Sequence, residues 1–174
     1  TNTTMKIIIY ILTLLILCAC ANTPQKNEKS IITVTLASLS YFTEAIAGDN
    51  FQVISMVPKG SSPESYDPTP QQLVNLSQSQ AYFRIGYIGF EQVWMDKLEA
   101  NSPDMKVYDT SVGVDLIRGE GHWHGDHYHE GGVEPHIWNS TQNALIIAEN
   151  IYKALCKLDA AHQADYQKRL DALK

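Results

Sequence analysis

Short apolar segments alternate with helix-like segments in the first two thirds of the chain, and this alternation constrains the fold most strongly. The four apolar segments cover residues 31–37, 51–57, 81–85 and 106–108, so they are 3–7 residues long. Segments of this length favour β-strands, and the first two are also rich in β-branched side chains. Helices are predicted between them, at residues 38–48, 71–79 and 90–100. Strands that alternate with helices predict the α/β class, a parallel sheet with helices on both faces.

Composition restricts the class of protein further. The 174 residues suffice for one ordinary domain with a core, or for one domain and part of another, and a hydrophobic content of 44% beside 18% charged residues is typical of globular chains. The formal net charge is -6 and there is no basic run. Nucleic acid is therefore not expected as a partner.

The N-terminal segment has the pattern of a lipoprotein signal peptide over residues 5–20. Lys6 precedes an apolar run at residues 7–17, which is shorter than the ~20 residues that a membrane-spanning helix needs. The sequence LCAC then resembles a bacterial lipobox, with Cys20 as the lipidated residue because the small Ala19 precedes it. Residues 21–30 would form a polar tether outside the membrane. An uncleaved anchor helix is the alternative.

A histidine-rich stretch occupies residues 119–136. It holds five of the six histidines, namely His122, His124, His127, His129 and His136. Neutral imidazole is a common ligand for zinc-like cations, and short histidine-rich tracts are typical of metal binding. Interspersed glycines are expected to keep this stretch from forming a helix or a strand. The stretch is therefore predicted to be a flexible metal-attracting loop that stiffens at Pro135, with a solvated polar loop as the alternative.

The pattern from residue 139 onward is that of long helices. Asn139, with Gln142 three residues later, resembles a capping box. One apolar stripe then follows, formed by Ala144, Ile147, Ala148, Ile151, Leu155 and Leu158. Asp159 is expected to cap a further helix that is still running at Lys174, so the chain is expected to stop within an element.

Two loops leave the carboxyl ends of predicted strands, where open α/β sheets bind their ligands. The loop at residues 58–68 carries Glu64 after Pro63, and the loop at residues 113–135 leads to His136 after Pro135. Because proline restricts the backbone next to each residue, Glu64 and His136 are the expected metal ligands. Tyr66 and Asp67 are possible neighbours, and an ordinary exposed carboxylate is the alternative for Glu64.

Three segments together resemble the zinc/manganese substrate-binding proteins of ABC importers. They are GSSPESYDPTPQQ (60–72), GYIGFEQVWMDKL (86–98) and EPHIW (134–138), and LDAAHQADYQKRL (158–170) agrees with them. The resemblance implies two lobes joined by a long helix, with the metal held between them by histidine and carboxylate ligands. His136 matches the family's second histidine. Glu64 stands where the family's PHxY pattern has its first histidine, so a harder oxygen donor replaces an imidazole.

The resemblance also implies an organisation and a function. Residues 31–138 would form the metal-binding N-terminal lobe, and residues 139–174 would lead to a second lobe that supplies the remaining ligands. The chain would be a monomeric, lipid-anchored, non-enzymatic component at the cell envelope that delivers zinc, or manganese, to an ABC permease. The histidine-rich stretch resembles the zinc-collecting loop of zinc importers. Metal binding by this chain alone is expected to be weak and dominated by that loop.

Two other classes of protein remain open at this point. Residues 122–127 fit HxHxDH, the pattern of dinuclear zinc hydrolases, whose fold would place the motif directly after an apolar strand in a largely antiparallel sandwich. A lipid-anchored adhesion or chaperone-like module with an incidental histidine loop is the other alternative.

Overall fold

The computed structural model describes residues 29–124, 126–129 and 131–174. The proposed signal peptide, Cys20 and all but the last two residues of the polar tether lie outside the described residues. In the part of the chain that the structure describes, no helix is both long and apolar enough to cross a membrane.

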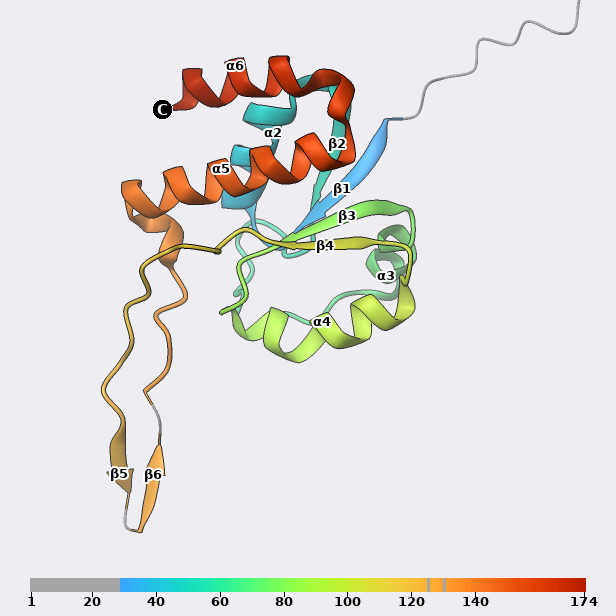
Figure 1. The fold of residues 1–174 in the computed structure, drawn as a ribbon. Helices are drawn as coiled ribbons and strands as arrows, with labels where there is room; N and C mark the ends of the chain where they lie inside the picture. The colour runs from blue at the N-terminus through green and yellow to red at the C-terminus, as the bar shows by residue number, and fades with distance from the viewer. Residues whose placement is uncertain (1–28, 125, 130) are drawn as a thin grey trace, which may run out of the picture.

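A four-stranded parallel sheet forms the centre of the molecule, in the order β2-β1-β3-β4 (Figure 1). Its strands are β1 (Ser30–Val34), β2 (Phe51–Ser55), β3 (Ser79–Arg84) and β4 (Lys106–Asp109). Most residues of the central strands β1 and β3 are buried, and Ile32, Val34, Ala81 and Phe83 have no exposed surface. Continuous apolar runs form such strands because a parallel sheet is covered on both faces. The predicted α/β class is confirmed.

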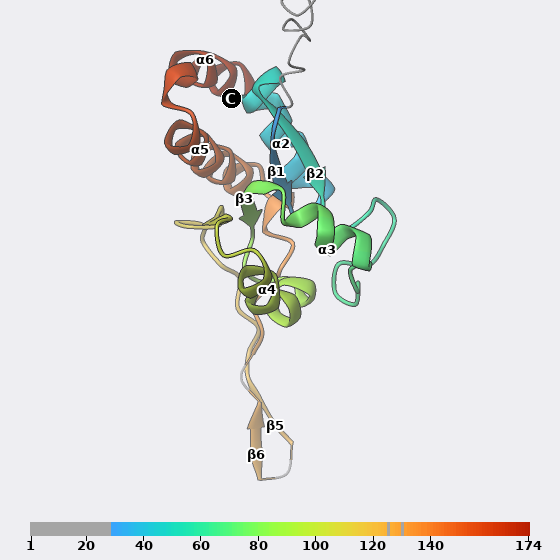
Figure 2. The same cartoon turned by 90° about the vertical axis from the view of Figure 1, so that its right-hand side faces the viewer.

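Helices cover both faces of this sheet. Figures 1 and 2 show one layer formed by α2 (Ala37–Ala47), α5 (Thr141–Leu158) and α6 (Gln163–Leu173), and a second formed by α3 (Pro70–Leu76) and α4 (Gly89–Asn101). Ile147 and Ile151 of the predicted apolar stripe are fully buried in α5, and Leu98 of α4 is fully buried on the other side. The core therefore lies on both sides of the sheet, as the alternating pattern predicts.

The start of α3 follows the sequence signal closely. The Thr69 hydroxyl accepts a hydrogen bond from the Gln72 amide, the Gln72 side chain reaches back to the Thr69 amide, and Pro70 is the first helical residue. This capping box satisfies two helix N–H groups reciprocally. The helix ends at Leu76, earlier than predicted, because Ser79 already pairs with β1 as the first residue of β3.

Two expectations about helix starts near the C-terminus are wrong. Asn139 does not cap α5, because it ends a short 3-10 helix (Ile137–Asn139); Ser140 is the cap, and its hydroxyl accepts from the Asn143 amide. Asp159 does not cap α6 directly, because a second 3-10 helix (Ala160–His162) lies between them.

The histidine-rich stretch was expected to form neither helix nor strand, and this is also wrong. It forms an antiparallel hairpin of β5 (His122–His124) and β6 (His127–His129) that extends away from the body (Figures 1 and 2). The sequence HWH-GD-HYH carries a signal for this hairpin, since two alternating segments separated by Gly-Asp are typical of a two-residue hairpin loop.

Candidate metal site at the carboxyl edge of the sheet

The loop that carries Glu64 follows β2 and is fixed to the first turn of α4. Glu64 Oε2 accepts a hydrogen bond of 2.9 Å from the Gly89 amide, and the Phe90 amide donates to the Pro63 carbonyl over 3.0 Å. These N–H groups have no partner within the helix, and a carboxylate is favoured at this positive end of the helix dipole. Glu64 is exposed, and among the described contacts its Oε1 accepts no hydrogen bond. One carboxylate oxygen thus holds the loop while the other remains free to bind a cation.

Gly89 is required for this close approach. A Cβ atom there would lie 2.6 Å from the Glu64 carbonyl oxygen and 2.7 Å from Glu64 Oε2. We expect Gly89→Ala to displace the Glu64 loop and to lower the free energy of unfolding by about 1–3 kcal/mol, the usual cost of overpacking. Urea denaturation measures this change. Gly132→Ala is the matched control, because a Cβ there meets no atom within 4 Å; equal midpoints for the two variants would contradict the prediction.

His136 lies just before α5, at the end of the long connection that follows β4. Its Nδ1 is 2.5 Å from Glu134 Oε1, and its backbone amide donates to the same oxygen over 3.1 Å. These hydrogen bonds, the side-chain bond first, hold the pKa of the Glu134 carboxyl below its usual range. The ring of Trp138 lies beside the imidazole, with ring centroids 5.2 Å apart. The imidazole is exposed, and its orientation is set by local contacts.

An open cavity of about 300 Å³ adjoins His136. The cavity is lined by Asp115, Ile117, Glu134, His136, Ile137, Asn139, Ser140 and Asn143. Glu64 does not line this cavity. Among the side chains that the structure describes, no group of three or more histidine, cysteine or acidic residues is placed to hold a metal ion. The described side chains therefore form no complete metal site, and Glu64 lies outside the cavity that adjoins His136.

The predicted neighbours of Glu64 have structural partners of their own. The Tyr66 hydroxyl donates to Gln72 Oε1 over 2.7 Å, and Asp67 Oδ1 accepts from Trp94 Nε1 over 3.2 Å. Both contacts connect the Glu64 loop to helices α3 and α4. These residues stabilise the loop.

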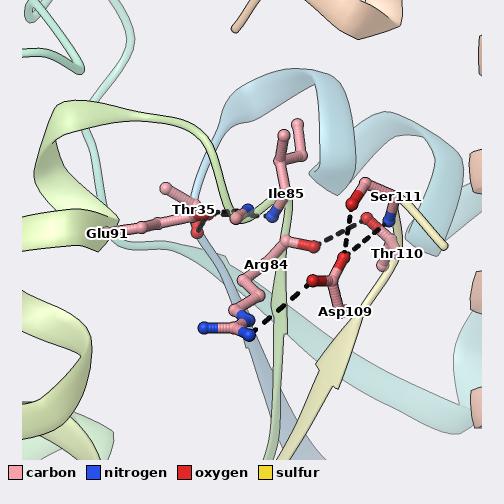
Figure 3. A network of polar contacts seen from close by, with 8 residues as sticks. Thr35, Arg84, Ile85, Glu91, Asp109, Thr110 and Ser111 are labelled. Atoms are coloured by element: carbon pink, nitrogen blue, oxygen red, sulfur yellow. Dashed lines mark hydrogen bonds and ion pairs between the residues drawn. The ribbon is translucent and has the colours of Figure 1, made fainter. Parts of the chain in front are cut away.

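A buried polar network at the same edge of the sheet was missed by the sequence analysis. Glu91, in the first turn of α4, is 3% exposed and accepts hydrogen bonds from the Thr35 hydroxyl and from the amides of Ile85 and Gly86 (Figure 3). The Tyr82 hydroxyl extends this hydrogen-bond network, because it lies 2.9 Å from Thr35 Oγ1. Burial raises the pKa of the Glu91 carboxyl above its usual 4.5, although the hydrogen bonds oppose this shift. The available signal was an acidic residue in the first turn of a predicted helix.

A second part of this network joins the ends of β3 and β4. Asp109 Oδ1 accepts from the amide and the hydroxyl of Ser111, while its Oδ2 lies 3.7 Å from Arg84 Nη2 (Figure 3). Thr110 donates its hydroxyl to the Arg84 carbonyl over 2.8 Å. The network fixes the point at which the connection toward His136 leaves the sheet.

The hairpin brings four of the predicted metal-binding residues into register. His122 lies opposite His129 and His124 lies opposite His127, with Trp123 opposite Tyr128. Directly opposed residues, and residues two apart along one strand, occupy the same face of a hairpin. The four histidine positions therefore belong to one face.

Comparisons with known proteins agree on one family. The family model described as zinc-uptake complex component A periplasmic (ZnuA) matches residues 32–174. The chain is 33% identical over 170 residues to the iron ABC transporter substrate-binding lipoprotein MtsA of Streptococcus pyogenes serotype M1, covering 92% of this chain and 53% of MtsA. It is 32% identical over 158 residues to the manganese ABC transporter substrate-binding lipoprotein ScaA of Streptococcus gordonii, covering 87% and 49%.

Solved structures give the same result. The crystal structure of a ZnuA deletion mutant with zinc bound matches with a TM-score of 0.73 and 36% sequence identity, over 83% of this chain and 52% of that one. This chain spans about half the length of the curated relatives that it matches.

Proposed function

The chain belongs to the zinc-uptake complex component A (ZnuA) family, and from this membership we propose that it acts as the solute-binding component of an ABC importer. It captures a divalent metal ion, zinc in the first place, outside the cytoplasm and delivers it to a membrane permease. It performs no chemistry on its cargo. The activity of the whole protein requires the ligands of a second lobe. Residues 139–174, whose helices α5 and α6 cover one face of the sheet, would lead to that lobe from residues 31–138.

The observation that carries this proposal is the position of the two predicted ligands. Glu64 lies in the connection after β2 and His136 in the connection after β4, so both belong to the carboxyl edge of the parallel sheet. Open α/β sheets bind their ligands at this edge. The hydrolase alternative requires the histidine motif to follow a strand of an antiparallel sandwich, whereas here the main sheet is parallel and the motif lies in a separate hairpin.

The donor types favour zinc, with manganese as the second candidate. Imidazole nitrogen at His136 and at the hairpin positions suits zinc, while the carboxylate of Glu64 also suits harder ions such as manganese. The relatives are named for iron and for manganese, and a solved relative holds zinc. Because the relatives differ in their metals, we base the order of zinc before manganese on the donor atoms of this chain.

Anchoring and partners follow from the same family. The relatives are lipoproteins, which supports lipidation at Cys20 and a position at the cell envelope, facing away from the cytoplasm. The permease in the cytoplasmic membrane is the expected partner. The chain acts as a monomer and does not bind nucleic acid.

Calorimetric titration tests the proposed ligands. In a variant with His122, His124, His127 and His129 changed to alanine, we expect one weak zinc site, because two donors are half of a tetrahedral set. A further His136→Ala change should abolish it. Glu64→Gln keeps an acceptor for the Gly89 amide but removes the charge, whereas Glu64→Ala removes both.

The two Glu64 variants separate binding from loop structure. If Glu64 binds the metal, both variants weaken zinc binding, and Glu64→Gln does so without loss of stability. Tight one-to-one binding in the hairpin variant would contradict the expected weak site. Unchanged binding after both the His136 and Glu64 changes would contradict the ligand assignment.

A further inference from the structure

The contact between Glu134 and His136 determines which imidazole nitrogen is free. An ionised carboxylate only accepts hydrogen bonds, so Glu134 Oε1, 2.5 Å from His136 Nδ1, requires the proton on Nδ1. The lone pair of a neutral imidazole is then on Nε2. Metal-binding histidines commonly donate their other ring N–H to a carboxylate in this way.

The backbone around Glu134 is held by the stem of the hairpin. The Glu134 amide donates to the Ile117 carbonyl over 2.9 Å, and the Gly119 amide donates to the Gly132 carbonyl over 2.9 Å. Arg118 and Val133 form an antiparallel bridge between these two bonds. The stem therefore ends at the residue that contacts the imidazole.

The single residue between Glu134 and His136 makes this connection stiff. Pro135 has a fixed φ and restricts the residue before it to extended conformations. Glu134 Oε1 also accepts from the His136 backbone amide, so one oxygen holds both the ring and the main chain of His136. A shift of the stem is thereby transmitted to the imidazole.

We propose that Glu134 is a positioning residue, held by the hairpin stem, that keeps Nε2 of His136 as the metal-binding nitrogen. This inference rests on the proposed function only in taking His136 as a ligand. It gives the hairpin a role beyond collecting metal: its stem prepares His136 for binding. Glu134 itself is not a ligand in this arrangement.

The test is made in the variant that lacks the four hairpin histidines, so that zinc reports on the site that contains His136. Glu134→Ala is expected to shift the neutral His136 ring toward the Nε2–H tautomer, seen in the ¹⁵N chemical shifts of the ring, and to weaken zinc binding about 10–100-fold. Glu134→Gln keeps an acceptor oxygen and should restore the Nδ1–H tautomer and most of the affinity. If Glu134 were itself a ligand, Glu134→Gln would bind zinc as poorly as Glu134→Ala, even though His136 kept the Nδ1–H tautomer in Glu134→Gln.

The stem is tested with a matched pair of glycine variants. A Cβ at residue 131 would overlap the Gly119 carbonyl, whereas one at Gly132 meets no atom within 4 Å. We expect Gly131→Ala to shift the tautomer in the same direction as Glu134→Ala, and Gly132→Ala to leave it unchanged. A retained Nδ1–H tautomer in Glu134→Ala, or in Gly131→Ala, would overturn the inference. Because the tautomer is measured without metal, this result is independent of whether the chain binds zinc.

Discussion

Replacing Glu91 with alanine is expected to lower the free energy of unfolding by about 3 kcal/mol. The change leaves the amides of Ile85 and Gly86 and the hydroxyl of Thr35 without their acceptor inside the protein. A buried donor that loses its partner costs about 1–3 kcal/mol, and large mutational effects arise from buried networks of this kind. Urea denaturation measures the loss. Glu99→Ala, at an exposed position of the same helix, is the control and should change stability by no more than about 0.5 kcal/mol.

The stability contributed by Glu91 should also depend on pH. Burial raises the pKa of this carboxyl in the folded state above the 4.5 expected when unfolded. The folded state therefore binds the proton more tightly, so the contribution is fully present below pH 4.5 and is lost as the pH rises through the folded pKa. The glutamine of Glu91→Gln cannot ionise. The free energy of unfolding of this variant, relative to the parent, should therefore increase as the pH rises from 4.5 through the folded pKa. A difference that does not change with pH would show that Glu91 has an ordinary pKa.

Removing the four hairpin histidines is expected to abolish multisite zinc binding. We expect the parent chain to bind more than one zinc ion, because the register brings four imidazole positions to one face. Manganese should give little heat at the hairpin, since imidazole sites bind it more weakly than zinc. Calorimetry of the parent and of the four-alanine variant measures both. His162→Ala is the control, because this histidine lies outside the hairpin with its Nδ1 2.6 Å from Asp159 Oδ2.

Double variants test whether opposed histidines act as pairs. Changing His122 and His129 removes one opposed pair and leaves His124 opposite His127. Changing His122 and His127 removes one member of each pair. If opposed residues share a zinc ion, the second variant should lose more zinc than the first. Equal losses would show that the histidines bind independently of the register, and a parent without zinc binding would exclude the hairpin as a zinc collector.

Local sequence patterns predicted most of the framework correctly. The apolar runs became the buried strands of the sheet, the Thr69–Pro70 signal began α3, and the apolar stripe from residue 139 onward became the buried face of α5. These features depend on residues close together in the chain. The hairpin signal is local as well, but it is short: the glycines of this stretch predict irregular structure, whereas the alternating residues on either side of Gly-Asp predict strands.

The sequence by itself thus determined the fold class and the family, because these depend on local periodicity and on short motifs; the metal-binding residues that it suggests stay a prediction. The tertiary structure decided which groups hold those residues. Glu64 meets the Gly89 amide across 25 positions, and Thr35 meets Glu91 across 56. Such contacts have no sequence periodicity, because they depend on how the ends of the strands come together when the sheet forms.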